Sequence, residues 1–339
     1  MWKRWMTAAA LAGATAAAAQ PPAYNAGMTA FEVPYHGGRM EVTLWYPTRA
    51  AEALRSFGPY RPSVALGAAV VDGQYPVVLV SHGTGGGALN HHLQAEALAR
   101  RGFLVASPVH PGDNFRDRSM SADARYFFER PRQLTHLLDQ LLAHPQWRRS
   151  IDPARVGAMG HSAGGFSVAA LAGGVPDTRR MLQHCAAVAD DPACAFRDPK
   201  IGVAAPGGTP LQLPASATAS GTVRDPRIRA AVLMAPLGQP IVPGSLAGSA
   251  ATVKMIGAEH DEVLPRAYHY DQLRTQLPAG GQARLAAGAG HYAFIVPTDP
   301  AWKDRLGPVP TDPPGFDRER FHRQLSDEIV GFFEQALRH

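Results

Sequence analysis

Short apolar runs separated by helical patterns recur along most of this chain. Continuous apolar runs, typical of strands covered on both faces, lie at residues 76–81, 103–107, 155–159, 228–234 and 251–256. Apolar positions spaced three and four residues apart predict helices over residues 91–101, 130–142 and about 316–337. This alternation predicts an α/β fold, in which a mostly parallel central sheet has helices on both faces.

Two parts of the chain depart from that alternation. Residues 41–46 alternate polar and apolar positions before Pro47, which predicts an early strand antiparallel to its neighbour. Residues 173–225 interrupt the rhythm and include a run rich in Gly, Pro, Ser and Ala at 202–221. We predict that residues 173–225 form a cap-like insertion over the functional site, within a single domain spanning residues 20–339.

The N-terminus has the pattern of a secretory signal peptide. Lys3 and Arg4 precede an alanine-rich apolar run that ends in three alanines at residues 17–19. An uncleaved membrane anchor is the alternative, but the run is short for crossing a bilayer. The sequence therefore predicts that residues 1–19 are removed, and that the mature protein is periplasmic or secreted and has no membrane span.

Composition and charge narrow the class of protein. The apolar share of 45% and the charged share of 18% are those of a globular chain with a core. Residues 1–19 contain Lys3 and Arg4 and no acid, so their removal lowers the formal net charge from +5 to +3 (5 − 2). Such a mild positive excess, spread along the sequence, gives no case for nucleic-acid binding.

The chain has two cysteines, Cys185 and Cys194. In an oxidising compartment a close pair predicts one disulfide that closes a local loop. Two free thiols or a metal site are the alternatives. A metal site needs more ligands at short spacing, and a redox pair is usually C-x-x-C.

The motif GHSAG at residues 160–164 lies between the apolar run 155–159 and a small-residue helix pattern at 165–172. This context predicts a nucleophile elbow, in which a tight strand-to-helix turn exposes the Ser162 hydroxyl above the sheet. Gly160 and Gly164 fit because larger side chains would collide in such a turn. An ordinary Gly/Ser loop is the alternative.

A serine nucleophile needs a base to take its proton and an acid to orient that base. In chain order the acid follows the serine and the histidine comes last. Asp261 lies in a loop after a predicted strand, and His291 lies in the later sequence GAGHYAF. We therefore predict Asp261 as the acid and His291 as the base, with Glu259 and Glu262 as rivals for the acid.

Charge that develops on a carbonyl oxygen needs donors in place beforehand. The amide of Ala163, the residue after the nucleophile, is one expected donor. The second is expected from the sequence SHGTGGG at residues 81–87, with Thr84 as first choice and Gly85 as the alternative. This loop lacks the G-K-[ST] ending of a phosphate-binding loop.

Other histidines carry less information. His91 and His92 are adjacent, so on a helix they point in different directions and make a poor metal pair. The sequence HPGDN at residues 110–114 fits either the rim of a pocket or a structural turn. We expect neither a metal nor an organic cofactor for the predicted chemistry.

These motifs resemble those of the α/β-hydrolases, and most closely the bacterial group similar to dienelactone hydrolase and platelet-activating-factor acetylhydrolase. The resemblance covers residues 32–333 approximately, and it rests on LWYP at 44–47, SHGTG at 81–85, GHSAGG at 160–165 and the Cys185–Cys194 segment with DPA at 191–193. It implies an α/β-hydrolase fold and a serine hydrolase acting on a small-molecule or lipid-like carboxylic ester.

One departure matters, because dienelactone hydrolases use a cysteine nucleophile and this chain has Ser162. The chain is therefore expected to cleave esters by serine chemistry. Lipase, polyester hydrolase and amidase activities on the same residues are alternatives, and so is a non-catalytic binding protein with a hydrolase fold.

Overall fold

The computed structural model describes residues 24–338, apart from 122, 124, 189 and 195–219. The predicted signal peptide at residues 1–19 and most of the run at 202–221 lie outside the described residues. Within the described ranges, no helix combines the length and the apolar character that crossing a membrane requires.

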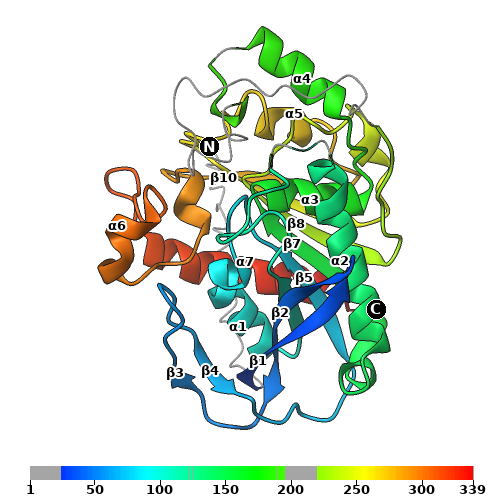
Figure 1. Ribbon diagram of the computed structural model, residues 1–339, viewed down its shortest axis with the longest axis vertical. Helices are drawn as coiled ribbons and strands as arrows, with labels where there is room; N and C mark the ends of the chain where they lie inside the picture. Colours follow the sequence, from blue (N-terminus) through cyan, green and yellow to red (C-terminus); the bar gives the residue numbers. More distant parts are fainter. Residues whose placement is uncertain (1–23, 122, 124, 189, 195–219, 339) are drawn as a thin grey trace, which may run out of the picture.

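A ten-stranded sheet forms the centre of the molecule (Figure 1). Its strands are β1 (Asn25–Tyr35), β2 (Gly38–Thr48), β3 (Ala53–Leu54), β4 (Ser63–Leu66), β5 (Tyr75–Ser81), β6 (Leu104–Pro108), β7 (Ile151–His161), β8 (Ile228–Met234), β9 (Thr252–Ala258) and β10 (Gln282–Ala286). Their spatial order is β10-β9-β8-β7-β5-β6-β2-β1-β4-β3. The six strands from β10 to β6 are mutually parallel, and β2 pairs antiparallel with both β6 and β1.

Helices cover both faces of this sheet. The α-helices are α1 (His92–Arg100), α2 (Tyr126–Ala143), α3 (Ala163–Ala172), α4 (Thr178–Ala187), α5 (Tyr270–Arg274), α6 (Lys303–Leu306) and α7 (Arg318–Ala336). Short 3₁₀ turns are η1 (Ala88–His91), η2 (Trp147–Arg149), η3 (Pro192–Cys194), η5 (Ser245–Gly248), η6 (His291–Phe294) and η7 (Pro300–Trp302).

The two faces of β5 show how the core divides. Val77 and Leu79 join the core beneath α2 and α3, whereas Val78 and Val80 join the core beneath α1 and α7. Successive strand residues point to opposite faces, so a strand covered on both sides must be apolar throughout. This explains why the uninterrupted apolar runs correctly predicted five of the six parallel strands, whereas β10, at the edge of the sheet, was not predicted.

The predicted α/β architecture with a mostly parallel sheet is confirmed, and the differences are shifted element ends and some elements that were not predicted. Helix α2 begins at Tyr126, four residues before its predicted start, because three adjacent aromatic residues from Tyr126 to Phe128 are buried there. The predicted early strand at 41–46 is the middle of β2, which pairs antiparallel with β1. Strand β1 itself was not predicted.

Within residues 173–225, the described part consists of α4, η3 and short extended pieces. Isolated bridges join Pro176 to Ile241, outside the segment, and Asp177 to Ser220, so the two ends of the segment lie side by side. Helix α4 begins after Asp177, whose side chain accepts a hydrogen bond from the amide of Arg179.

Candidate active site

The turn between β7 and α3 carries Ser162 in a strained backbone conformation. Its φ of 58° and ψ of −120° lie in a region that residues other than glycine rarely adopt, and such strain costs about 1–3 kcal/mol. A Cβ on Gly160 would overlap the carbonyl of Gly164, and a Cβ on Gly164 would overlap the carbonyl of Ser81. The two glycines are therefore sterically required in this turn.

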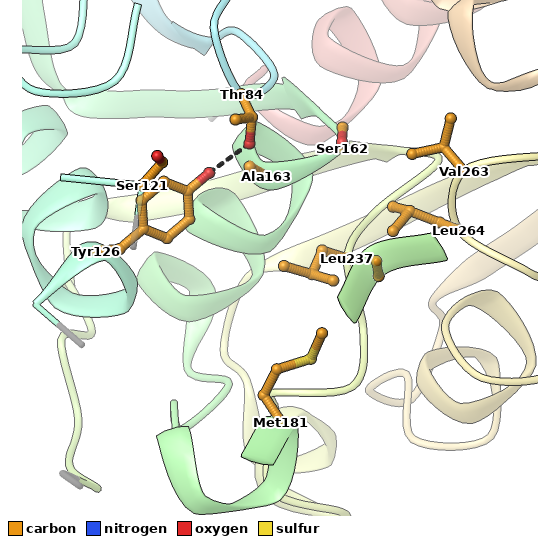
Figure 2. Close-up of a pocket in the computed structure, with 10 residues that line it drawn as sticks. Thr84, Ser121, Tyr126, Ser162, Ala163, Met181, Leu237, Val263 and Leu264 are labelled. Atoms are coloured by element: carbon orange, nitrogen blue, oxygen red, sulfur yellow. Dashed lines mark hydrogen bonds between the residues drawn. The ribbon is translucent and has the colours of Figure 1, made fainter. Parts of the chain in front are cut away.

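Ser162 opens onto a pocket at the carboxyl ends of the parallel strands (Figure 2). Hydroxyl groups lie on one side of this pocket and apolar side chains on the other. Its lining consists of Thr84, Ser121, Tyr126, Ser162, Ala163, Met181, Ala193, Leu237, Val263 and Leu264. Such a mixture of apolar surface and few polar groups is typical of a site for a small organic ligand.

His291 and Asp261 meet beside this pocket. His291 begins η6, and its Nδ1 lies 3.0 Å from the carboxylate of Asp261, which follows β9. The side chains are 1% and 4% exposed. A carboxylate only accepts hydrogen bonds, so Nδ1 carries the proton and Nε2 keeps a free electron pair. The amides of Val263 and Leu264 donate to Asp261 Oδ1 at 3.1 and 2.7 Å and fix the carboxylate.

The two rival acids bond backbone amides instead. Glu259 accepts from the amide of Gly288 at 2.8 Å, and Glu262 accepts from the amide of His291 at 2.9 Å. Both glutamates therefore shape the loop that carries His291, whereas Asp261 bonds its imidazole.

His161, which sequence analysis did not single out, also holds the His291 loop. Its Nε2 lies 3.0 Å from the carbonyl oxygen of His291, and the two ring centroids are 4.7 Å apart. Burial, and then the charges of His291 and His91, hold the pKa of His161 well below its usual range. His161 thus acts as a neutral donor, one residue before the serine.

The predicted donor amides are those of Ala163 and Thr84. Among the described residues, neither amide has a hydrogen-bond partner, and both residues line the pocket. The amide of Gly85, the alternative to Thr84, donates to Asp113 Oδ1 at 2.9 Å. The structure therefore leaves Thr84 as the better placed of the two candidates.

Behind this loop lies a buried polar network. His110 Nε2 is 2.9 Å from Ser81 Oγ, and its Nδ1 is 2.7 Å from Gln133 Oε1. Burial and the charge of Arg130 hold the pKa of both His82 and His110 well below the usual range. Residues 110–114, for which a pocket rim and a structural turn were both open, form a turn that carries Asp113 into this network.

The opposite side of the pocket comes from α4 and η3. We call these two elements, together with Asp191 and the His269 side chain that bonds it, the α4 wall. As predicted, Cys185 and Cys194 form a disulfide, which joins α4 to η3. His184 and His269 both bond Asp191 Oδ2 through their Nε2 atoms, and the His269 contact is 3.0 Å. Burial alone would raise the pKa of Asp191, but these hydrogen bonds outweigh it and lower the pKa.

The α4 wall also contains a possible metal-ligand group in the described part of the chain. Ligand atoms of His184, Asp191 and Cys194 lie within 4.8 Å of one another. The Cys194 sulfur is bonded in the disulfide and has no thiolate to offer, so this group is a poor fit for a metal.

The parallel sheet, the strained serine turn and the late acid and histidine loops together define an α/β-hydrolase fold. No protein-family model matches the chain, and no curated protein does. Among solved structures, it is similar to a ferulic acid esterase from Streptomyces cinnamoneus, with 20% sequence identity and a TM-score of 0.59. The match covers 95% of this chain and 92% of that one, so the likeness in fold spans nearly the whole molecule.

Proposed function

We propose that this protein is a serine hydrolase that cleaves carboxylic esters through an acyl-enzyme intermediate. The observation that carries the proposal is the placement of Ser162. It occupies a strained turn with φ of 58°, opens onto a partly apolar pocket, and is followed by an amide without a partner among the described residues. Backbone strain of this kind is concentrated at functional sites.

The mechanism assigns each residue one task. Ser162 Oγ attacks the ester carbonyl carbon while His291 Nε2 takes the hydroxyl proton. The hydrogen bond from His291 Nδ1 to Asp261 supports this by keeping Nε2 unprotonated beforehand and by stabilising the imidazolium afterwards. The amides of Ala163 and Thr84 donate hydrogen bonds to the carbonyl oxygen and stabilise the negative charge that develops on it.

The tetrahedral intermediate then breaks down to the acyl-enzyme, and the acyl-enzyme is hydrolysed in a second step. The bond from the acyl carbon to the alcohol oxygen breaks, and the imidazolium of His291 returns its proton to the leaving alcohol. Water next attacks the acyl carbon while His291 takes one of its protons. The bond from that carbon to Ser162 Oγ then breaks, the imidazolium returns its proton to Oγ, and the acid leaves. Every group needed is a side chain or a backbone amide, so the proposed reaction requires no cofactor.

The proposed substrate is a small-molecule or lipid-like ester, and the proposed location is the periplasm or the extracellular space. The disulfide between Cys185 and Cys194 supports this location because such bonds persist in oxidising compartments. The signal-peptide pattern at residues 1–19 supports it independently.

A fluorophosphonate probe tests the nucleophile directly. The probe should label wild-type protein at Ser162 and leave Ser162→Ala unlabelled, and the variant should lose at least about 10³-fold in kcat on p-nitrophenyl acetate. Circular dichroism checks that the variant is folded. Labelling of a different residue, or turnover by Ser162→Ala close to that of wild type, would contradict the proposal.

A substrate panel separates the possible hydrolase classes. It should include p-nitrophenyl esters of increasing chain length, methyl ferulate, a polyester film and a p-nitroanilide. Methyl ferulate is included because the similar structure is a ferulic acid esterase. We expect esters to be cleaved in preference to the anilide, and dominant anilide cleavage would favour an amidase instead.

A further inference from the structure

Behind the loop that carries Thr84, a complete ion pair is buried. Arg130, in the second turn of α2, bonds Asp113, in the turn after β6, and both side chains are 0% exposed. Taking two charges out of water is costly, and apolar replacements of such pairs are often neutral or stabilising. Stability alone therefore gives little reason to bury charges at this place.

The contacts of the pair suggest another reason, because it holds the backbone on both sides of Thr84. The amide of Gly85 donates to Asp113 Oδ1 at 2.9 Å. On the other side, Arg130 Nη2 donates to the carbonyl oxygen of His82. Fixing the carbonyl of residue 82 and the amide of residue 85 restricts the peptide units between them.

Helix α2 also reaches the Thr84 side chain. The Tyr126 hydroxyl lies 2.5 Å from Thr84 Oγ1. The Arg130 guanidinium lies over the Tyr126 ring, 5.6 Å from its centroid. Tyr126 and Arg130 are four residues apart and share one face of the helix, so a single turn of α2 supports the whole loop.

The amides of the two residues after Gly85 are also occupied. The amide of Gly86 donates to the carbonyl of Gly83 at 3.0 Å, and the amide of Gly87 donates to Asn90 Oδ1 at 2.5 Å. With the amide of Gly85 bonded to Asp113, these contacts leave the Thr84 amide available at the pocket. A donor of this kind stabilises a transition state only if it is already in place, and a misplacement of about 1 Å can cost about 10²-fold in rate.

We propose that the buried Asp113–Arg130 pair positions the Thr84 amide as an oxyanion donor, so that Asp113 and Arg130 are positioning residues for ester hydrolysis. This inference rests on the proposed function. It requires that loss of the pair lower transition-state stabilisation and leave ground-state binding of the ester nearly unchanged.

The test is the double variant Asp113→Leu/Arg130→Met, which removes both charges together and leaves neither one buried alone. We expect kcat to fall about 10- to 100-fold with KM within about threefold, because removing an oxyanion donor outright costs about 10²–10³-fold. End-point labelling with a fluorophosphonate counts the competent sites, and kcat is expressed per labelled site.

The matched control is Asp225→Leu/Arg227→Met. Asp225 and Arg227 also form an ion pair, with the Asp225 side chain 3% exposed. Although Asp225 is the last residue of the predicted insertion, both residues directly precede β8, at the opposite end of the sheet from Ser162. We expect kcat per labelled site to stay within about twofold of wild type in this control, whatever happens to its thermal stability.

A second readout separates positioning from a general loss of structure. With a trifluoromethyl ketone, Ser162 Oγ bonds the ketone carbon, the carbonyl electrons move to oxygen as an oxyanion, and His291 holds the serine proton. The Ki of this inhibitor should rise by the same factor as kcat/KM falls, while the Ki of the product acid stays within about threefold.

The outcomes are decisive in each case. A double variant whose kcat per labelled site is within threefold of wild type overturns the inference, and so does a fall in kcat with an unchanged inhibitor Ki.

If the double variant does not fold, the variant Arg130→Lys provides the test, because it keeps the charge beside Asp113 and is too short to reach the carbonyl of His82. Its kcat and inhibitor affinity should fall together, by about threefold or more, and unchanged values overturn the inference. A wild-type protein that is neither labelled nor active on any ester instead refutes the proposed function.

Discussion

The two sides of the pocket use histidine in different ways. Beneath the proposed catalytic residues, His82, His110 and His161 are buried and bond neutral partners, and the pKa of each lies well below the usual range. In the α4 wall, His184 and His269 instead bond one buried carboxylate, that of Asp191. We refer to His82, His110, His161 and the loops they hold as the catalytic floor.

This difference suggests a division of labour. Neutral imidazoles give the catalytic floor directional hydrogen bonds without adding charge beside Ser162, the proposed nucleophile, where any new charge would act strongly in a low dielectric. In the α4 wall, His184 and His269 join two separate elements through Asp191. Changes to the floor should therefore affect turnover of every ester, whereas changes to the wall should affect which ester fits.

The largest expected effect concerns the carboxylate that bonds His291. Asp261→Asn should lower kcat by about 10³- to 10⁴-fold, because an amide can donate to Nδ1 and so favour the tautomer in which Nε2 is protonated. The measurement is kcat on p-nitrophenyl acetate, with folding checked by circular dichroism. Glu259→Gln is the control, since Glu259 bonds the amide of Gly288, and it should stay within about threefold.

Much of the fold was readable from sequence, because strands covered on both faces must be apolar throughout. The run at residues 228–234 coincides with β8, and Gly160 and Gly164 mark the turn, since only glycine fits there. Strand β1 lacks such a run, because exposed residues alternate with half-buried or buried ones from Ala30 to Val33.

The residues that hold the site in place could not be predicted from the sequence in the same way. Asp113 and Arg130 are 17 residues apart, and neither the HPGDN turn nor the helix pattern that contains Arg130 indicates a partner, so their pairing depends on how β6 and α2 are placed. His161 was part of a recognised motif, but its bond to the carbonyl of His291 spans 130 residues. Motif chemistry identified the proposed reacting groups, whereas only tertiary structure identifies the residues that hold them.

Lowering the pH should reduce the free energy of unfolding because of buried histidines such as His91. Burial is the main cause that lowers the pKa of His91 to about 4. In the unfolded chain such a histidine takes up its proton near pH 6.5, while the folded protein excludes that proton until lower pH. Stability is therefore lost as pH falls from about 6.5 to about 4, by about 1.4 kcal/mol per pH unit for each such histidine.

The variant His91→Phe removes one titrating group of similar shape. Its free energy of unfolding in urea, measured between pH 7.5 and 5, should depend on pH less steeply than that of wild type, by about one proton. An unchanged urea m-value would show that the unfolding reaction itself is the same. A slope equal to that of wild type would mean that His91 is already protonated in the folded protein.

Removing the Cys185–Cys194 disulfide tests the role of the α4 wall. Cys185→Ser/Cys194→Ser opens a loop with a sequence separation of nine, which should cost about 2.5 kcal/mol of stability. Met181 and Ala193 line the pocket on either side of this bond, so the preference among p-nitrophenyl esters of different chain length should change. A uniform loss of kcat on all esters would contradict the proposed division of labour.

The smallest effect is expected for the hydroxyl pair at the edge of the floor. Thr84→Val keeps the backbone amide and removes the hydroxyl that bonds Tyr126, and Tyr126→Phe removes the partner. Each should lower kcat by about 2- to 10-fold, the range that a net hydrogen bond of about 0.5–1.5 kcal/mol allows.

The double variant shows whether the two hydroxyls act as one unit. If they serve only to steady the loop, Thr84→Val/Tyr126→Phe should lose no more than the worse single variant, because the first substitution already breaks the contact. If instead the Thr84 hydroxyl itself donated to the oxyanion, Thr84→Val alone would cost about 10²-fold, as removal of a direct donor does. The size of this one loss therefore distinguishes a side chain that positions its own amide from a side chain that acts on the substrate.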